Sequence, residues 1–406
     1  MKLTFSTIYN LIVKALPAAA LLFPSTGYCT GLDPALIDRI ESSTSAINNL
    51  GVMAFDINPG AAAYRQDYTL GAFKLTTDYL HQDKAEIVQN GNGHLTGALN
   101  VESYMRLNKS TRVWGGAEFR TGQFRNIRWN NSADYLRVAP YVIGDSVGGD
   151  VQSRQYTFNG GYAGIKGRWT WGAQAAYRAN IEYRNRDPRV KIIVSDLNID
   201  LGASYSLTPR YRAGVSAGIN VYVQESDLEF YNPINTIQTY AMTGMGTTYT
   251  RFSGNSTEST AYSGIGYHTS LQLFSTTPYG LRLSVDYNFI RIDQILRDYN
   301  NLTLTYTDNY LLSGQTSYAL QLSGIITAGA QLNARWQRRL GTENLFGTSI
   351  GNNYERISSR TFYYHDIVTS QFTVPIQISL VRWQIVATPS LSFDYDRESY
   401  HRPYRD

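Results

Sequence analysis

The sequence is poor in cysteine and in charge, and each shortage excludes a class of protein. Its 406 residues include one cysteine, Cys29, so an intramolecular disulfide framework and a cysteine-rich zinc module are excluded. Charged residues make up only 17%, and the net charge of +4 comes from bases scattered among acids. Nucleic acid is therefore not an expected partner.

The sequence is instead rich in tyrosine and glycine, which number 32 and 34, whereas proline and methionine number only 12 and 5. Apolar residues make up 43% of the chain, so it does not have the composition of a disordered protein. This profile favours long strands with aromatic faces over helices.

Residues 1–29 have the pattern of an export signal. A basic residue precedes an apolar run over residues 11–23, and small residues follow it. The run is shorter than the roughly 20 apolar residues that a membrane-spanning helix needs. Cleavage after Gly27 and cleavage after Cys29 both fit the pattern. A lipoprotein signal that acylates Cys29 fits less well, because the bulky Tyr28 precedes the cysteine.

Apolar and polar residues alternate over long stretches from residue 66 onward. Between residues 169 and 184, aromatic and aliphatic side chains occupy the odd positions, and Gln174, Arg178 and Glu182 stand at even ones. Such alternation places the two sets on opposite faces of a strand. The predicted strands are roughly 12 to 18 residues long, and a tilted strand needs about 9 to 11 to cross a bilayer.

The alternation predicts thirteen strands. Their approximate ranges are 68–82, 94–108, 111–125, 151–166, 168–184, 189–207, 210–225, 261–275, 280–294, 310–327, 330–342, 361–378 and 381–397. Short turns are expected at 108–110, 167, 208–209, 276–278, 328–329 and 380. Mostly longer polar connections, at 83–93, 126–150, 185–188, 226–260, 295–309 and 343–360, alternate with them. Tight turns at one end and long loops at the other are typical of outer-membrane barrels.

We therefore predict an all-β protein, a transmembrane antiparallel up-and-down β-barrel in the bacterial outer membrane, in contact with its lipid. A soluble sandwich would be overfilled by so many long strands, and a propeller would show a fixed sequence period, which is absent. The predicted organisation is a signal peptide at 1–29, a periplasmic segment or lumen plug at 30–66, and the barrel at 67–406. Such barrels have even strand numbers, so about fourteen strands are expected and we interpret the polar end at 401–406 as a truncation.

The polar face of the strands is predicted to line the lumen. Its charged candidates come from neighbouring strands and include both signs; they are Arg106, Arg120, Arg178, Glu182, Asp196, Asp200, Arg212 and Asp286. If the hairpin turns near residues 187–188, Arg178 lies opposite or diagonal to Asp196. Such pairs can create a transverse field for a polar solute, or they can be salt bridges that fill a closed interior.

The chain resembles the Bacteroidota outer-membrane barrels known as domain of unknown function 6850. The resemblance covers most of residues 50–406 and rests on Phe55-Asp56-Ile57-Asn58-Pro59-Gly60, on Gly91-Asn92-Gly93 and on Arg397-Glu398-Ser399-Tyr400. It implies a role in nutrient or metal acquisition beside a TonB-dependent receptor and a surface lipoprotein. It implies no catalytic residues.

A second, weaker similarity is to the fatty-acid transporters of the outer membrane, fourteen-stranded barrels whose N-terminal hatch carries Asn-Pro-Ala. Here Asn58, Pro59 and Gly60 precede the first strand, and Gly60 departs from the alanine. A short helix at 34–40 also fits a hatch. Asn-Pro-Gly forms turns in any protein, so a plain turn on the periplasmic rim is the favoured interpretation and a lumen plug the alternative.

Catalytic and metal-binding patterns are weak. The five histidines show no paired metal-ligand spacing, so no metal and no cofactor are expected. His365 beside Asp366 is the best hydrolase candidate, but adjacent strand residues point to opposite faces and cannot cooperate directly.

The sequence therefore predicts a non-enzymatic, porin-like barrel that takes up a small solute, alone or with a TonB-dependent receptor. A closed barrel that anchors a surface complex is the first alternative, and an outer-membrane hydrolase is the second.

Overall fold

The computed structural model describes residues 45, 47, 49–66, 68–231, 238–253, 259–351, 353–380 and 384–402. The chain divides into two compact units, Met1–Ser45 and Ala46–Asp406, and every helix and strand described here belongs to the second. The predicted signal peptide at 1–29, with Cys29, and the predicted helix at 34–40 lie outside the described residues.

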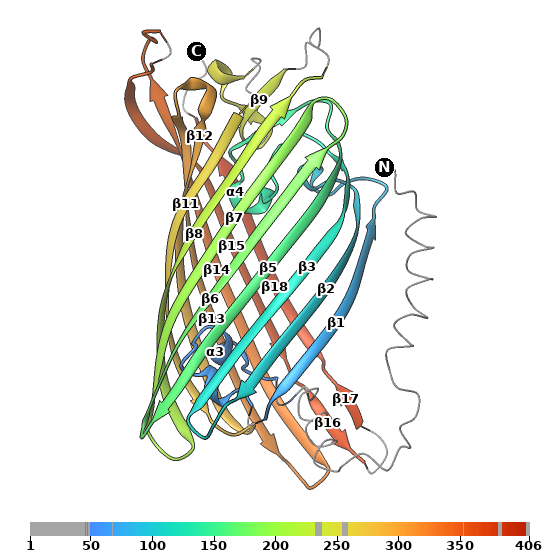
Figure 1. Ribbon diagram of the computed structural model, residues 1–406, viewed down its shortest axis with the longest axis vertical. Helices are drawn as coiled ribbons and strands as arrows, with labels where there is room; N and C mark the ends of the chain where they lie inside the picture. Colours follow the sequence, from blue (N-terminus) through green and yellow to red (C-terminus); the bar gives the residue numbers. More distant parts are fainter. Residues whose placement is uncertain are drawn as a thin grey trace. The chain divides into compact units, whose positions relative to one another are not determined.

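A single antiparallel sheet forms the wall of this second unit (Figure 1). Each strand pairs with the next one along the wall, which is the up-and-down order predicted from the sequence. The strands in this order are β1 (Leu70–His81), β2 (Gly93–Arg106), β3 (Thr111–Ile127), β5 (Gly149–Lys166), β6 (Trp169–Arg184), β7 (Arg189–Ser206), β8 (Tyr211–Glu229), β11 (Ser259–Ser275), β12 (Gly280–Leu296), β13 (Leu302–Gln321), β14 (Ile326–Phe346), β15 (Arg356–Thr373) and β18 (Ser390–Tyr400).

Smaller elements lie at the two ends of the wall. Strands β16 (Ile376–Ser379) and β17 (Gln384–Ala387) bring the sheet to 15 strands, and β4 (Val142–Asp145), β9 (Thr239–Gly244) and β10 (Thr247–Thr248) form a second, 3-stranded sheet. The helical turns are α3 (Met53–Asp56), α4 (Tyr135–Val138), η1 (Ala62–Tyr64), η2 (Val88–Asn90), η3 (Thr250–Phe252) and η4 (Arg297–Tyr299).

The all-β architecture and the thirteen long strands are confirmed, but four predicted connections are wrong. The single-residue turn expected at 380 is instead a longer connection, because β15 ends at Thr373 and β18 begins at Ser390, with the short strands β16 and β17 between them. The turn expected at 328–329 lies at 322–325, because the Ser323 hydroxyl accepts hydrogen bonds from the backbone N–H groups of Ile325 and Ile326. The long loops expected at 295–309 and 343–360 are shorter, because the strands on both sides continue into them. Threonine-rich strand ends resemble a loop in composition.

The two faces of the sheet differ as the alternation predicts. In β6, Trp169, Trp171 and Tyr177 are exposed on the outer face, whereas Thr170, Asn180 and Glu182 on the inner face are buried. Aromatic rings of neighbouring strands contact each other on the outer face, as between Trp169 and Tyr205, whose ring centroids are 4.8 Å apart. Aromatic residues at a strand's end are typical of a membrane interface.

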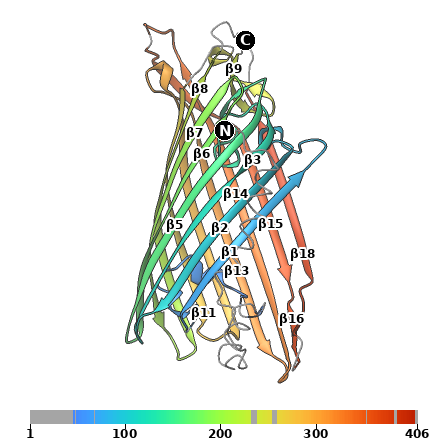
Figure 2. The same cartoon turned by 45° about the vertical axis from the view of Figure 1, so that its right-hand side comes forward.

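Strands β1 and β18 end the wall (Figure 2). Within the described residues they do not pair with each other, and all residues of β1 are exposed. Their backbone groups would need partners inside a bilayer.

The connections differ between the two ends of the wall. The turns between β2 and β3, β5 and β6, and β7 and β8 are short, and we call this the turn end. Residues 128–148 and the described residues between β8 and β11 lie at the opposite end, which we call the loop end. Short turns face the periplasm in outer-membrane barrels. Among the described residues, no helix has the length and hydrophobicity needed to cross a membrane.

An apolar outer face predicts that the purified chain needs detergent to stay in solution. Exposed side chains such as Leu75, Ile265 and Leu271 are 76%, 71% and 65% accessible to solvent. We expect the unboiled protein to migrate faster on a denaturing gel than the boiled protein, because a paired β-wall resists the detergent. Full solubility without detergent, with no heat-dependent change in mobility, would contradict the membrane assignment.

Candidate functional site: a lumen filled from both ends

The N-terminal segment packs against the inner face of the sheet at the turn end, as Figure 1 shows for α3. We call its described residues from Ile47 to Gln66 the plug. Phe55 contacts Phe274 of β11 edge to face at 5.3 Å, and Leu50 packs against Ala319 of β13. The plug and the wall therefore share small apolar clusters.

Polar contacts hold the plug in many other places. The Gln331 and Gln315 side chains accept hydrogen bonds from the backbone N–H groups of Gly51 and Met53 at 3.0 and 3.2 Å. The Tyr104 hydroxyl of β2 donates to the carbonyl of Ala62 at 3.0 Å. These partners lie on opposite sides of the wall, so the plug crosses the lumen.

The Asn58-Pro59-Gly60 turn lies at the centre of this docking. Asn58 is fully buried, and its amide donates to the carbonyls of Ala203 and Val215 at 3.1 and 3.2 Å and to the Gln272 side chain at 2.8 Å. The predicted plain turn on the rim is therefore replaced by a turn seated against β7, β8 and β11. The turn itself is closed by the Gly60 N–H, which donates to the Asn58 side chain at 2.8 Å.

Three glycines of the wall make room for this turn. Gly172 of β6 and Gly202 of β7 are directly opposite each other, and Gly214 lies on the neighbouring β8. A Cβ atom on Gly172 would overlap Pro59, and one on Gly202 or Gly214 would overlap the Asn58 amide. We call these three glycines the glycine socket. The plug can therefore dock here only because these three wall positions have no side chain.

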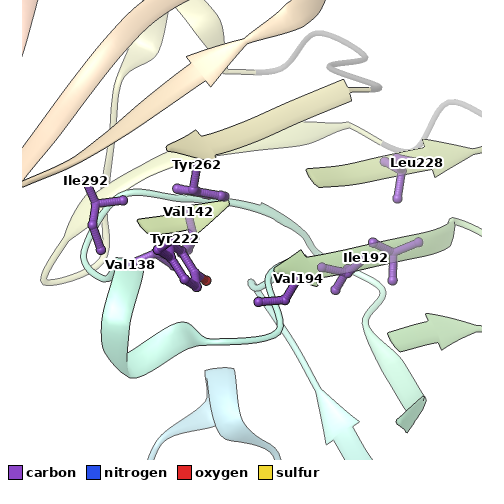
Figure 3. Close-up of a cluster of buried hydrophobic side chains, with 9 residues drawn as sticks. Val138, Val142, Ile192, Val194, Tyr222, Leu228, Tyr262 and Ile292 are labelled. Atoms are coloured by element: carbon purple, nitrogen blue, oxygen red, sulfur yellow. The ribbon is translucent and has the colours of Figure 1, made fainter. Parts of the chain in front are cut away.

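Residues 128–148, between β3 and β5, fold back over the loop end; we call them the mouth insert. Its strand β4 pairs with β9 from the other long connection. Val138 and Val142 of the insert pack against Val194, Tyr222 and other inward residues of the wall (Figure 3). The long polar loops predicted at 126–150 and 226–260 are therefore partly structured and partly buried.

Ion pairs dock the mouth insert on predicted lumen residues. Arg178 binds Asp134 through two hydrogen bonds of 2.9 and 2.5 Å, and it approaches Asp196 at 3.3 Å. Arg137 donates to Asp196 at 2.7 Å and to Asn220 at 2.6 Å. Arg178 and Asp196 are directly paired across β6 and β7, as the hairpin register predicts.

One ion pair of the insert is almost completely withdrawn from solvent. Arg184 of β6 donates to Asp145 of β4 at 2.7 Å, and both side chains are 1% exposed. The other oxygen of Asp145 accepts hydrogen bonds from the backbone N–H groups of residues 147 and 148.

Tyr141 is another buried polar residue of the mouth insert. Burial raises the pKa of its phenol well above the usual range, so the phenol remains neutral.

The other predicted lumen residues are spread along the wall. Asp200 pairs with His268 at 2.9 Å, and the nearby Asp286 has one buried oxygen without a hydrogen-bond partner among the described residues. Glu182 accepts from Asn180 at 3.1 Å. Arg212 donates to Thr170 at 2.9 Å and lies over the ring of Tyr64 in the plug.

Arg120 and Arg106 lie outside both docking sites. Among the described residues, Arg120 pairs only with Glu118 on its own strand, at 3.1 Å. Arg106 also stands on the inner face, near Thr69, whose hydroxyl accepts its backbone N–H.

The sequence prediction missed Asp134 and Arg137, because they lie in a connection. The sequence did hold one signal that this connection is buried. The run from Val138 to Ile143 is apolar except for Pro140, and an exposed loop does not need so many apolar residues in succession. No group of three or more histidine, cysteine or acidic residues able to hold a metal occurs in the described part of the chain.

The sheet has an apolar outer face and a polar inner face, and its antiparallel strands are long enough to cross a membrane. These features define the class: this is a bacterial outer-membrane β-barrel protein. The chain belongs to the family of unknown function DUF6850, whose model matches residues 59–406. No curated protein matches it.

Several solved outer-membrane proteins match most of this chain at low identity. The toluene transporter TodX from Pseudomonas putida has 9% identity and a TM-score of 0.33, over 85% of this chain and 93% of that one. The monoaromatic hydrocarbon channel CymD has 12% identity and a TM-score of 0.33, over 88% and 94%. The alcaligin receptor FauA from Bordetella pertussis has 12% identity and a TM-score of 0.35, over 80% and 56%. Values this low transfer neither ligand nor role.

Proposed function

We propose that this protein is a gated channel for the uptake of a small polar solute, and that it has no catalytic role. One observation carries the proposal: the inner wall is polar and charged, and segments of the chain that dock largely through polar contacts fill it from both ends. Side chains alone can fill a barrel of about eight strands, but a wall of thirteen long strands is too wide for that, so it encloses a space that separate segments close.

The space left between the inserts supports this proposal. Cavities of about 720 and 780 Å³ lie beside the mouth insert, and one of about 360 Å³ lies beside the plug. The last is lined by Asp56, Arg65 and Glu102, among others. These volumes are in the range of small-molecule sites. Movement of the plug would open the cavity of about 360 Å³ to solvent at the turn end.

The test is single-channel conductance in planar bilayers. We expect the full chain to be closed for most of the time, and a variant without residues 47–66 to conduct continuously, because the plug is the only described segment that crosses the lumen at the turn end. A matched variant with a deletion of similar kind in the loop-end residues 347–355, away from the plug, is expected to conduct like the full chain. A plug-free variant that stays sealed would refute the channel.

We further propose that the solute is delivered with the help of a TonB-dependent receptor and a surface lipoprotein. The loop end exposes large apolar side chains that such a partner could contact, among them Tyr231, Met245 and Ile350. Affinity purification from native outer membranes should recover the partner in constant proportion to this chain.

The alternative is a closed barrel that anchors a surface complex. The buried pair of Arg184 and Asp145 favours it, because a fixed insert suits an anchor better than a gate. Partner recovery together with a sealed plug-free variant would support this alternative.

The hydrolase alternative has little support. His365 faces inward and binds Asp396 at 2.7 Å, whereas Asp366 faces outward near Arg338. The histidine therefore has a carboxylate partner, but no serine or cysteine hydrogen-bonds to it among the described residues.

A further inference from the structure

A cavity of about 370 Å³ lies inside the wall beside α4, whose Arg137 lines it, and its lining is unusual in composition. Guanidinium and amide side chains dominate it, and no carboxylate belongs to it; the residues that matter are Arg137, Asn198, Asn220, Asn288, Arg335 and Arg339. The mouth insert supplies Arg137, and the wall supplies the others. We call this space the arginine chamber.

The register of the sheet places several of these side chains in one row. Asn198 pairs with Asn220, which pairs with Gly266, and the row continues through Ile290 and Asn309 to Arg339. Paired inward residues lie about 5 Å apart. At Gly266, which has no side chain, the neighbouring Ile290 fills the space that a Cβ atom would take.

The positive charges in and around the chamber are unequally balanced. Arg137 and Arg178 are matched by Asp134 and Asp196, with which they form ion pairs. Arg335 is different, because among the described residues it binds only the neutral Gln337, at 3.0 Å.

Arg339 has neutral partners as well. It donates to the Asn309 side chain and to the carbonyls of Leu136 and Ala139, at 2.9 Å for the latter. Along their own rows, both arginines are two strands away from the next carboxylate: Asp286 and Asp394 for Arg335, and Glu398 for Arg339. Two strands span about 10 Å. Arg335 and Arg339 therefore share one chamber, and neither forms an ion pair among the described residues. The nearest carboxylates on their other side, Asp396 and Glu398, line the neighbouring cavity of about 780 Å³.

We propose that the arginine chamber binds a small organic anion, with its carboxylate on Arg335 and its hydroxyl or amide groups on the asparagines. A guanidinium binds a carboxylate through two parallel hydrogen bonds. The Arg335 side chain is exposed on the inner face of the wall, so a ligand that enters the lumen can reach it. The Asn288 side chain lines the chamber and makes no hydrogen bond within the described part of the chain, so its amide can both donate to and accept from such a ligand. The inference rests on the proposed channel and names the class of its solute.

The test is calorimetric titration of the full chain in detergent with gluconate, glucose and inorganic phosphate. Gluconate and glucose are close in size and both hydroxylated, but only gluconate has a carboxylate. We expect gluconate to bind, glucose to give no measurable heat, and phosphate to bind at least tenfold more weakly than gluconate. Phosphate binding equal to that of gluconate would overturn the organic ligand, and equal binding of glucose would overturn the role of charge.

Variants assign the binding to the chamber. Arg335→Gln is expected to weaken gluconate binding at least tenfold, and Arg335→Lys to recover part of the loss. Arg120→Gln is the matched control, because Arg120 also faces the lumen but lies outside the chamber and pairs with Glu118; its affinity should stay within twofold. The heat-dependent gel shift verifies that each variant is folded. Equal losses for Arg335→Gln and Arg120→Gln would overturn the site.

The two proposals can fail separately. Gluconate binding that depends on Arg335, combined with a plug-free variant that does not conduct, would retain the anion site and refute the channel. Conductance of the plug-free variant without gluconate binding would retain the channel and refute the site.

Discussion

Gly202→Leu is expected to expel the plug from the lumen and leave the protein continuously conducting. The leucine side chain would occupy the position of the Asn58 amide, which currently makes three hydrogen bonds there. Overpacking costs about 1–3 kcal/mol, and each lost hydrogen bond about 1 kcal/mol. Even a net loss of about 3 kcal/mol shifts the ratio of docked to undocked plug by roughly 100-fold.

The wall itself should tolerate this change. Gly202 is an inward residue in the middle of a paired strand, and the space around it is filled by the plug and not by wall side chains. Once the plug has left, the leucine side chain points into the lumen. We therefore expect an unchanged heat-dependent gel shift together with open conductance and rapid proteolysis of residues 47–66.

Ala203→Leu is the matched control, because it places the same side chain on the same strand, one residue later and on the outer face. Its backbone carbonyl still accepts the hydrogen bond from Asn58. We expect this variant to conduct like the unmodified protein. If Gly202→Leu and Ala203→Leu behaved alike, the glycine socket would have no role in seating the plug.

The strands of the wall could be predicted from the sequence because each strand's two faces are set by the alternation of its own residues. A strand with one face in lipid and one in the lumen must alternate, so residues such as Trp169, Trp171 and Arg178 specify both the strand and its facing. The turn expected at 328–329 was wrong, because those residues lie inside β14. The side-chain hydrogen bonds of Ser323 decide for the earlier turn, whereas Gly329 continues the strand.

The filling of the lumen could not be predicted in the same way. Alternation shows that Asp196 faces inward, but it does not show that Arg137, which lies 59 residues away in a connection, will bind it. Contacts between segments so far apart leave no periodic trace in the sequence. The glycine socket was a usable signal, because Gly172, Gly202 and Gly214 all stand at inward positions of three consecutive strands.

Arg184→Met is expected to undock the mouth insert without unfolding the wall. The substitution would leave the Asp145 carboxylate buried without its cation, and breaking a buried pair in this way costs about 3–5 kcal/mol. The insert is a connection that pairs with β9 and not with the long strands, so the loss is confined to it. Hydrogen exchange of the amides of Val142 to Asp145 should therefore accelerate at least 100-fold.

The double variant Arg184→Met/Asp145→Asn distinguishes loss of the pair from loss of packing. Asparagine keeps the oxygen that accepts the N–H groups of residues 147 and 148, but it is neutral, so no buried charge is left. We expect it to restore most of the protection. Arg189→Met is the control, because its pair with Asp187 is partly exposed and contributes less than about 1 kcal/mol. Equal amide exchange rates at Val142 to Asp145 in Arg184→Met and Arg189→Met would show that the buried pair does not hold the insert. A gating movement at the loop end would then not require this ion pair to break.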